Sequence, residues 1–89
     1  MRASGERDIN LSSPATYTIK IPSKYPFIAL TGDFVQSTNL HDWSISNESL
    51  RLQQLSIGTI IVRNLTSIKE KLSINIYYLD NLILTLLFQ

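Results

Sequence analysis

Residues 72–89, LSINIYYLDNLILTLLFQ, decide the fold class of this chain. On either side of Asp80-Asn81, apolar side chains recur at every second position, which is the spacing of a half-buried β-strand. The two runs therefore predict a β-hairpin with one apolar face. The members of this face are Leu72, Ile74, Ile76 and Tyr78 on the first strand and Leu82, Leu84, Leu86 and Phe88 on the second.

The length of the turn decides which residues of the hairpin face one another. A two-residue turn at Asp80-Asn81 places Ser73 opposite Phe88 and mixes polar with apolar side chains on both faces. A three-residue turn over residues 79–81 puts all eight apolar side chains on one face, and Asn81 tolerates the left-handed conformation that such a turn needs at its third position. We therefore expect the three-residue turn, with the pairs Tyr78–Leu82, Ile76–Leu84, Ile74–Leu86 and Leu72–Phe88.

The opposite face of the hairpin is mixed, because Ser73, Asn75 and Thr85 alternate there with larger side chains. Burying Ile83 or Leu87 stabilises a structure by roughly 1.5–3 kcal/mol each, so a loop or the N-terminal arm could cover them. A subunit contact is the other interpretation, since contiguous exposed apolar patches often mark interaction sites. The candidate oligomer interface is Tyr77, Ile83 and Leu87.

The rest of the chain contains short apolar runs separated by turn signals about every eight to twelve residues, which is typical of all-β domains. We expect a small antiparallel β-sandwich or barrel, jelly-roll-like or immunoglobulin-like, with at most one or two helical turns near residues 46–49 and 66–71. Residues 1–7 are expected to form a flexible N-terminal arm, and residues 8–89 a single β domain.

The composition excludes several classes of protein. Apolar residues make up 44% of the 89, which is enough for a packed core, and the absence of cysteine excludes disulfides and cysteine-bound zinc. Charged residues are only 17% of the chain and the net charge is +1, so we expect no nucleic-acid partner. We also expect no membrane span, since no apolar run is long enough, and no signal-peptide core is visible in residues 1–10.

Catalytic and metal-binding patterns are missing from the sequence. His41 is the one histidine, and no nucleophile motif accompanies it and the neighbouring Asp42. The three glycines form no phosphate-binding loop. We therefore expect neither enzymatic activity nor a cofactor or metal. Three sequons, at Asn10, Asn47 and Asn64, could carry glycans if the chain meets a glycosylation machinery.

Aromatic side chains could bind a sugar by stacking. Trp43, Tyr25 and Phe34 could stack on a sugar ring, with Asp42 or Asn39 as polar partner. Of these residues, Trp43, Asp42 and Tyr25 are the predicted ligand contacts. The alternative is that Trp43 is a core residue at the start of a strand.

These features together predict a non-enzymatic structural or assembly module that self-associates as a homo-oligomer or with other subunits. A component of a virion capsid or of an extracellular surface fits best, because such proteins favour compact antiparallel sandwiches with near-neutral surfaces. A virion subunit can also face the outside without a signal peptide. A carbohydrate- or ligand-binding β-domain is the alternative function.

Overall fold

The computed structural model describes residues 5–10, 14–32, 34–46, 48–67 and 71–89. Within these ranges the regular structure is entirely β, with nine strands and no helix. The strands are β1 (Gly5–Ile9), β2 (Ala15–Lys20), β3 (Ala29–Gly32), β4 (Val35–Asn39), β5 (Asp42–Ile45), β6 (Leu50–Gln53), β7 (Thr59–Asn64), β8 (Leu72–Tyr78) and β9 (Asn81–Phe88).

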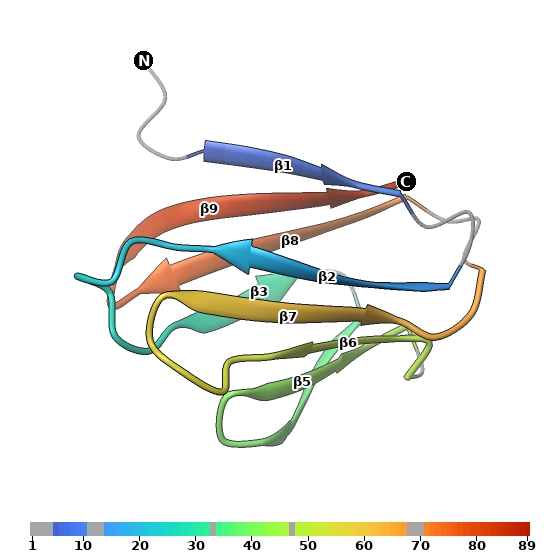
Figure 1. Ribbon diagram of the computed structural model, residues 1–89, viewed down its shortest axis with the longest axis horizontal. Coiled ribbons are helices and arrows are strands. Elements are labelled where there is room, and N and C mark those ends of the chain that lie inside the picture. Colours follow the sequence, from blue (N-terminus) through green and yellow to red (C-terminus); the bar gives the residue numbers. More distant parts are fainter. Residues whose placement is uncertain (1–4, 11–13, 33, 47, 68–70) are drawn as a thin grey trace.

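The strands form two sheets packed face to face (Figure 1). One sheet has the order β1-β9-β8-β3 and the other the order β2-β7-β6-β5-β4. All neighbouring strands are antiparallel except β1 and β9, which are parallel. The predicted small β-sandwich is thus confirmed, whereas a closed barrel is excluded and one strand pair departs from the expected antiparallel pattern.

Part of the strand order is the same as in the immunoglobulin sandwich, although the additional strands here extend the other sheet from that of variable domains. Strands β9, β8 and β3 face β2, β7 and β6 as strands G, F and C face B, E and D in that fold, and β5 and β4 extend the second sheet. The chain changes sheet between Gly32 and Val35, so β3 and β4 are almost continuous in sequence but belong to different layers.

The core lies between the two sheets and consists of the inward side chains of every second strand position. Both strands of the C-terminal hairpin contribute, as do β5, β6 and β7. The residues with no exposed surface are Ile45, Leu50, Leu52, Ile60, Val62, Ile74, Ile76 and Leu86. Trp43 is 6% exposed and belongs to this core.

The register of the hairpin confirms three of the four predicted pairs: Leu72–Phe88, Ile74–Leu86 and Ile76–Leu84. The fourth is wrong, because the register shifts after Ile76 and pairs Tyr77 with Leu82. The turn therefore consists of two residues, Leu79 and Asp80, rather than three. A β-bulge that leaves Ile83 without a partner reconciles the alternating pattern with this shorter turn.

Two further expectations concern the N-terminal arm and the short helical turns. Strand β1 begins at Gly5, inside the segment expected to be an arm, because its backbone pairs with β9. In the first expected helical turn, the described residues Ser46, Glu48 and Ser49 lie in a turn in which Ser49 N donates to Ser46 O, and β6 starts directly after Ser49. The second expected helical turn includes residues 68–70, which lie outside the described residues.

Candidate binding surface at one end of the sandwich

The three predicted ligand contacts do not form a common site. Trp43 is buried between the sheets, and Asp42, its neighbour on β5, points to the opposite side of its sheet. Tyr25 lies in the β2–β3 loop and packs against Tyr78 with ring centroids 5.5 Å apart. The Trp43 ring is therefore a core residue and offers no exposed face to a sugar.

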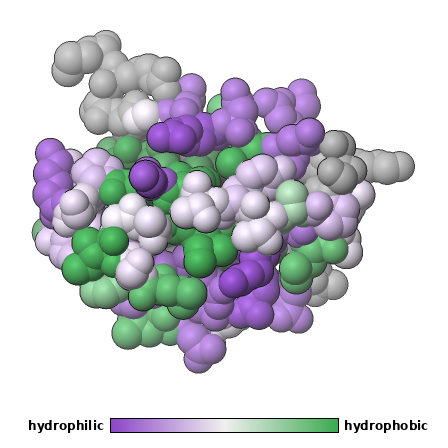
Figure 2. Space-filling model, viewed as in Figure 1, coloured by the Kyte–Doolittle hydropathy of each residue, from purple (hydrophilic) through white to green (hydrophobic). Residues whose placement is uncertain are grey.

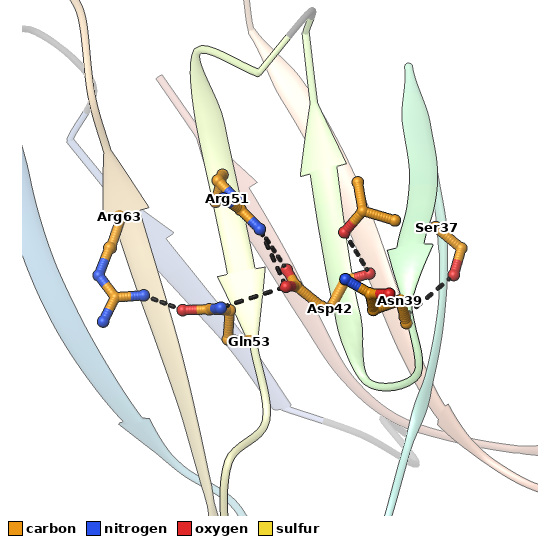
Figure 3. A network of polar contacts seen from close by, with 7 residues as sticks. Ser37, Asn39, Asp42, Arg51, Gln53 and Arg63 are labelled. Atoms are coloured by element: carbon orange, nitrogen blue, oxygen red, sulfur yellow. Dashed lines mark hydrogen bonds and ion pairs between the residues drawn. The ribbon is translucent and has the colours of Figure 1, made fainter.

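Asp42 belongs to a polar network on the outer face of the five-stranded sheet (Figure 3). Arg51 Nη2 donates to both carboxylate oxygens of Asp42, at 3.0 and 2.9 Å. Gln53 Nε2 donates to Asp42 Oδ2 at 3.2 Å, and Arg63 donates to Gln53 Oε1. The network joins β5, β6 and β7 across the sheet, so the side chain of Asp42 is already engaged within the molecule.

The predicted oligomer interface is divided by the bulge. Tyr77 and Leu87 lie on the outer face of the four-stranded sheet, since they alternate with buried neighbours. Ile83 is instead half-buried and packs against the core. Leu82, expected in the core, pairs with Tyr77 and so shares its face.

The sequons also differ in accessibility. Asn10 is exposed, whereas Asn64 is only 2% exposed at the end of β7. Asn47 lies outside the described residues. A glycan on Asn64 would be incompatible with this folded structure.

Sequence reasoning missed a different surface, the apolar loop end, which we define by Phe27, Leu40, Leu55, Ile57 and Leu79. These residues lie in the β2–β3 loop, the β4–β5 turn, the β6–β7 loop and the β8–β9 turn, which follow the left and lower left side of the sandwich in Figure 1. Their exposed fractions run from 45% for Phe27 to 85% for Leu40. Hydrophobic residues gather at the lower left of Figure 2, at the same end.

Side-chain and backbone contacts connect the loops of this end to one another. Phe27 stacks on His41 with ring centroids 4.5 Å apart and an interplanar angle of 15°, which ties the β2–β3 loop to the β4–β5 turn. Tyr25 and Tyr78 tie the same loop to the β8–β9 turn. Three of the loops and turns that carry the apolar loop end are therefore linked to one another by contacts of their aromatic rings.

A buried glutamine fixes the centre of this surface. Gln54, only 3% exposed, accepts a hydrogen bond from Ile28 N through Oε1 at 3.0 Å and donates from Nε2 to Pro26 O at 3.1 Å. Its backbone N–H donates to His41 O at 2.9 Å. One residue thus holds three loops in place, and the exposed Leu55 follows it directly.

Leu79 is held in a conformation that a leucine rarely adopts. Its φ is 54°, in the left-handed region where Gly and Asn are favoured, and its side chain is 77% exposed. The side chain therefore contributes little to the fold while its backbone conformation is unfavourable.

Replacing Leu79 with Gly is expected to raise the free energy of unfolding by about 1 kcal/mol, because the left-handed strain disappears. Urea denaturation followed by the fluorescence of the single tryptophan, Trp43, measures the change. Leu55→Gly is the matched control, since Leu55 is similarly exposed but has no positive φ. The control should lose about 0.5–1 kcal/mol through backbone entropy. Equal losses in both variants would contradict the argument.

The described residues contain no group of three or more His, Cys, Asp or Glu side chains that could hold a metal ion. Among them there is also no helix that is long and apolar enough to cross a membrane.

Comparison of the chain with protein-family models, with curated proteins and with solved structures finds no match.

Proposed function

We propose that this protein is a non-enzymatic structural module that self-associates, as a subunit of a virion or of another extracellular surface assembly. One observation carries the proposal: five large apolar side chains on four loops are exposed together at one end of the sandwich. Scattered single apolar residues are normal on a protein surface, but a group of them gathered on one side (Figure 2) favours an interaction site.

The organisation of the loops supports a binding role for this end. Loops joined by ring stacking and by the buried amide of Gln54 lose little conformational entropy when they meet a partner. In immunoglobulin variable domains the B–C and F–G loops at one end also form the binding surface, and the β2–β3 loop and β8–β9 turn are their counterparts here. This likeness concerns the fold alone, so it supports a binding role only together with the exposed apolar side chains.

Sugar binding by Trp43 has less support, since its ring is in the core and Asp42 is engaged by Arg51. The near-neutral charge of the chain suits contact between identical subunits, because identical subunits with a high net charge repel one another.

The test is the mass of the protein in solution as a function of concentration. Size-exclusion chromatography with light scattering should give a mass above the 10.1 kDa of one chain, and the mass should rise with concentration. Trp43 fluorescence at each concentration controls for unfolding, because aggregation of unfolded chains would expose the indole. A folded protein that remains a 10.1 kDa monomer throughout would contradict the proposal.

A further inference from the structure

We infer that two copies of this chain associate end to end, with the apolar loop end of one copy against that of the other and a twofold axis between them. The inference rests on the proposed function, because it assumes self-association and specifies the surface and its symmetry. A twofold contact uses the same patch on both copies, so this surface must be complementary to itself.

The apolar side chains provide the first part of that complementarity. Leu40 and Leu79 are the two most exposed large apolar residues in the described part of the chain, at 85% and 77%. Leu79 is also kept at a left-handed position where its side chain gives the isolated domain little stability. An unfavourable residue at a turn tip is explained if a second copy covers it, since strained residues concentrate at functional contacts.

The charges provide the second part. Lys24 and Asp80 flank the pair Tyr25–Tyr78 on adjacent loops of this end, and Lys24 Nζ lies 5.2 Å from the centroid of the Tyr25 ring. Among the described residues neither charge forms an ion pair within the chain. A twofold axis that passes between Lys24 and Asp80 would bring the lysine of each copy towards the aspartate of the other. One cation and one anion on the same patch therefore suit an identical partner.

The size of the end is compatible with a specific but modest contact. The molecule measures 33 × 31 × 20 Å, and in Figure 1 the long axis runs towards the apolar loop end. The cross-section of the whole molecule normal to this axis measures at most 31 × 20 Å, which limits the size of an end-to-end contact. A contact confined to this section lies near or below the lower limit of stable protein interfaces, about 1,200 Å² in total. A dimer that dissociates on dilution is the expected species.

A lipid surface suits the same residues less well. Leu79 and Asp80 are the two residues of one turn, so inserting the leucine among acyl chains would carry the carboxylate of Asp80 with it. In a contact between two identical copies, the Asp80 carboxylate of one copy can instead pair with Lys24 of the other.

The first experiment measures the dimer dissociation constant of Leu40→Ser beside that of the wild-type protein, by sedimentation equilibrium. Each dimer contains the substitution twice, so the constant should rise on the order of a hundredfold. Leu65→Ser is the control, because Leu65 is half-exposed after β7, at the opposite end, and its replacement should change the constant less than about twofold. Trp43 fluorescence confirms that each variant is folded.

The second experiment reverses the charges. Lys24→Asp and Asp80→Lys should each weaken the dimer about tenfold, since like charges then meet across the axis, and the double variant should recover most of the affinity. A double variant as weak as the single variants contradicts the twofold arrangement.

The outcomes separate this inference from the proposed function. If the wild-type protein is a monomer at all concentrations, the proposed function fails and the inference fails with it. If it associates but Leu40→Ser and the charge variants leave the constant unchanged, only the end-to-end arrangement fails. Vesicles of phosphatidylcholine with and without phosphatidylserine test the lipid alternative, and binding that Leu40→Ser abolishes while the protein stays monomeric overturns the inference in favour of a membrane.

Discussion

Replacing Gly32 with alanine is expected to lower the free energy of unfolding by about 3 kcal/mol, a large share of the 5–15 kcal/mol typical of a small domain. A Cβ atom at this position would lie 2.5 Å from the backbone oxygen of Ser73 and 3.0 Å from Ile74 Cα. Both are backbone atoms of the neighbouring strand, so no side-chain rotation can relieve the contact. Strand β3 would have to move away from β8.

The position of Gly32 in the fold makes the effect large. It is the last residue of β3 and pairs with Ile74, directly before the chain passes to the other sheet as β4. A shift of β3 therefore disturbs both the edge of the first sheet and the start of the crossing.

Urea denaturation monitored by Trp43 fluorescence measures the loss, and Gly5→Ala is the matched control. A Cβ on Gly5 meets only Leu84 Cδ1, at 3.6 Å, among the atoms that the structure describes. Its expected change is within about 1 kcal/mol and favours the folded state, because alanine restricts the unfolded chain. A loss below 1 kcal/mol for Gly32→Ala would show that β3 has more freedom to move than its packing suggests.

The fold could be predicted from the sequence where alternation extends over a whole strand. Leu72, Ile74 and Ile76 face Leu86 and its neighbours as expected, because a shift of one residue would move every apolar side chain of the hairpin to the wrong face. The pattern does not reveal a bulge, since Leu82 and Ile83 are both apolar and either could face the core. The bulge therefore made the predicted turn one residue too long.

The binding surface could not be predicted for a different reason. Leu40, Leu55 and Leu79 are isolated apolar residues in turn segments, where each alone is unremarkable. Only the strand order places their three loops at the same end of the sandwich. Periodicity within a strand carries no information about that order, so the apolar loop end becomes visible only in three dimensions. The same limit hid the parallel pairing of β1 with β9.

Replacing Gln54 with alanine is expected to lower the free energy of unfolding by about 3 kcal/mol and to loosen the apolar loop end. The side chain satisfies Ile28 N and Pro26 O, and no water can replace it fully because Ile28 is buried. Each buried polar group that loses its partner destabilises a protein by about 1–3 kcal/mol. The loop that carries Phe27 would lose both of these attachments, so the stacking of Phe27 on His41 should weaken and the dimer dissociation constant should rise as well.

Gln53→Ala is the matched control for this prediction, since it removes the same side chain one residue earlier in the chain. Gln53 lies on the outer face, half-buried, where its bonds to Asp42 and Arg63 compete with water. Gln53→Ala should therefore lower the free energy of unfolding by less than about 1 kcal/mol and leave the dimer dissociation constant unchanged. Comparable losses for the two variants would contradict the role given to Gln54.

Gln54→Glu separates the two hydrogen bonds of the amide by pH. A carboxylate at this position can still accept from Ile28 N but cannot donate to Pro26 O, whereas the protonated acid can do both. We expect burial beside the carbonyl of Pro26 to raise the pKa of this carboxyl above its value in the unfolded chain, about 4.3. The stability that the protonated acid supplies is therefore fully present below that value and is lost as the pH rises through the raised pKa. The free energy of unfolding of the variant should be closest to that of the wild-type protein in acid and furthest below it at neutral pH. Urea denaturation across this pH range measures the difference. A difference that is independent of pH would mean that the donor to Pro26 O contributes nothing to holding the loop.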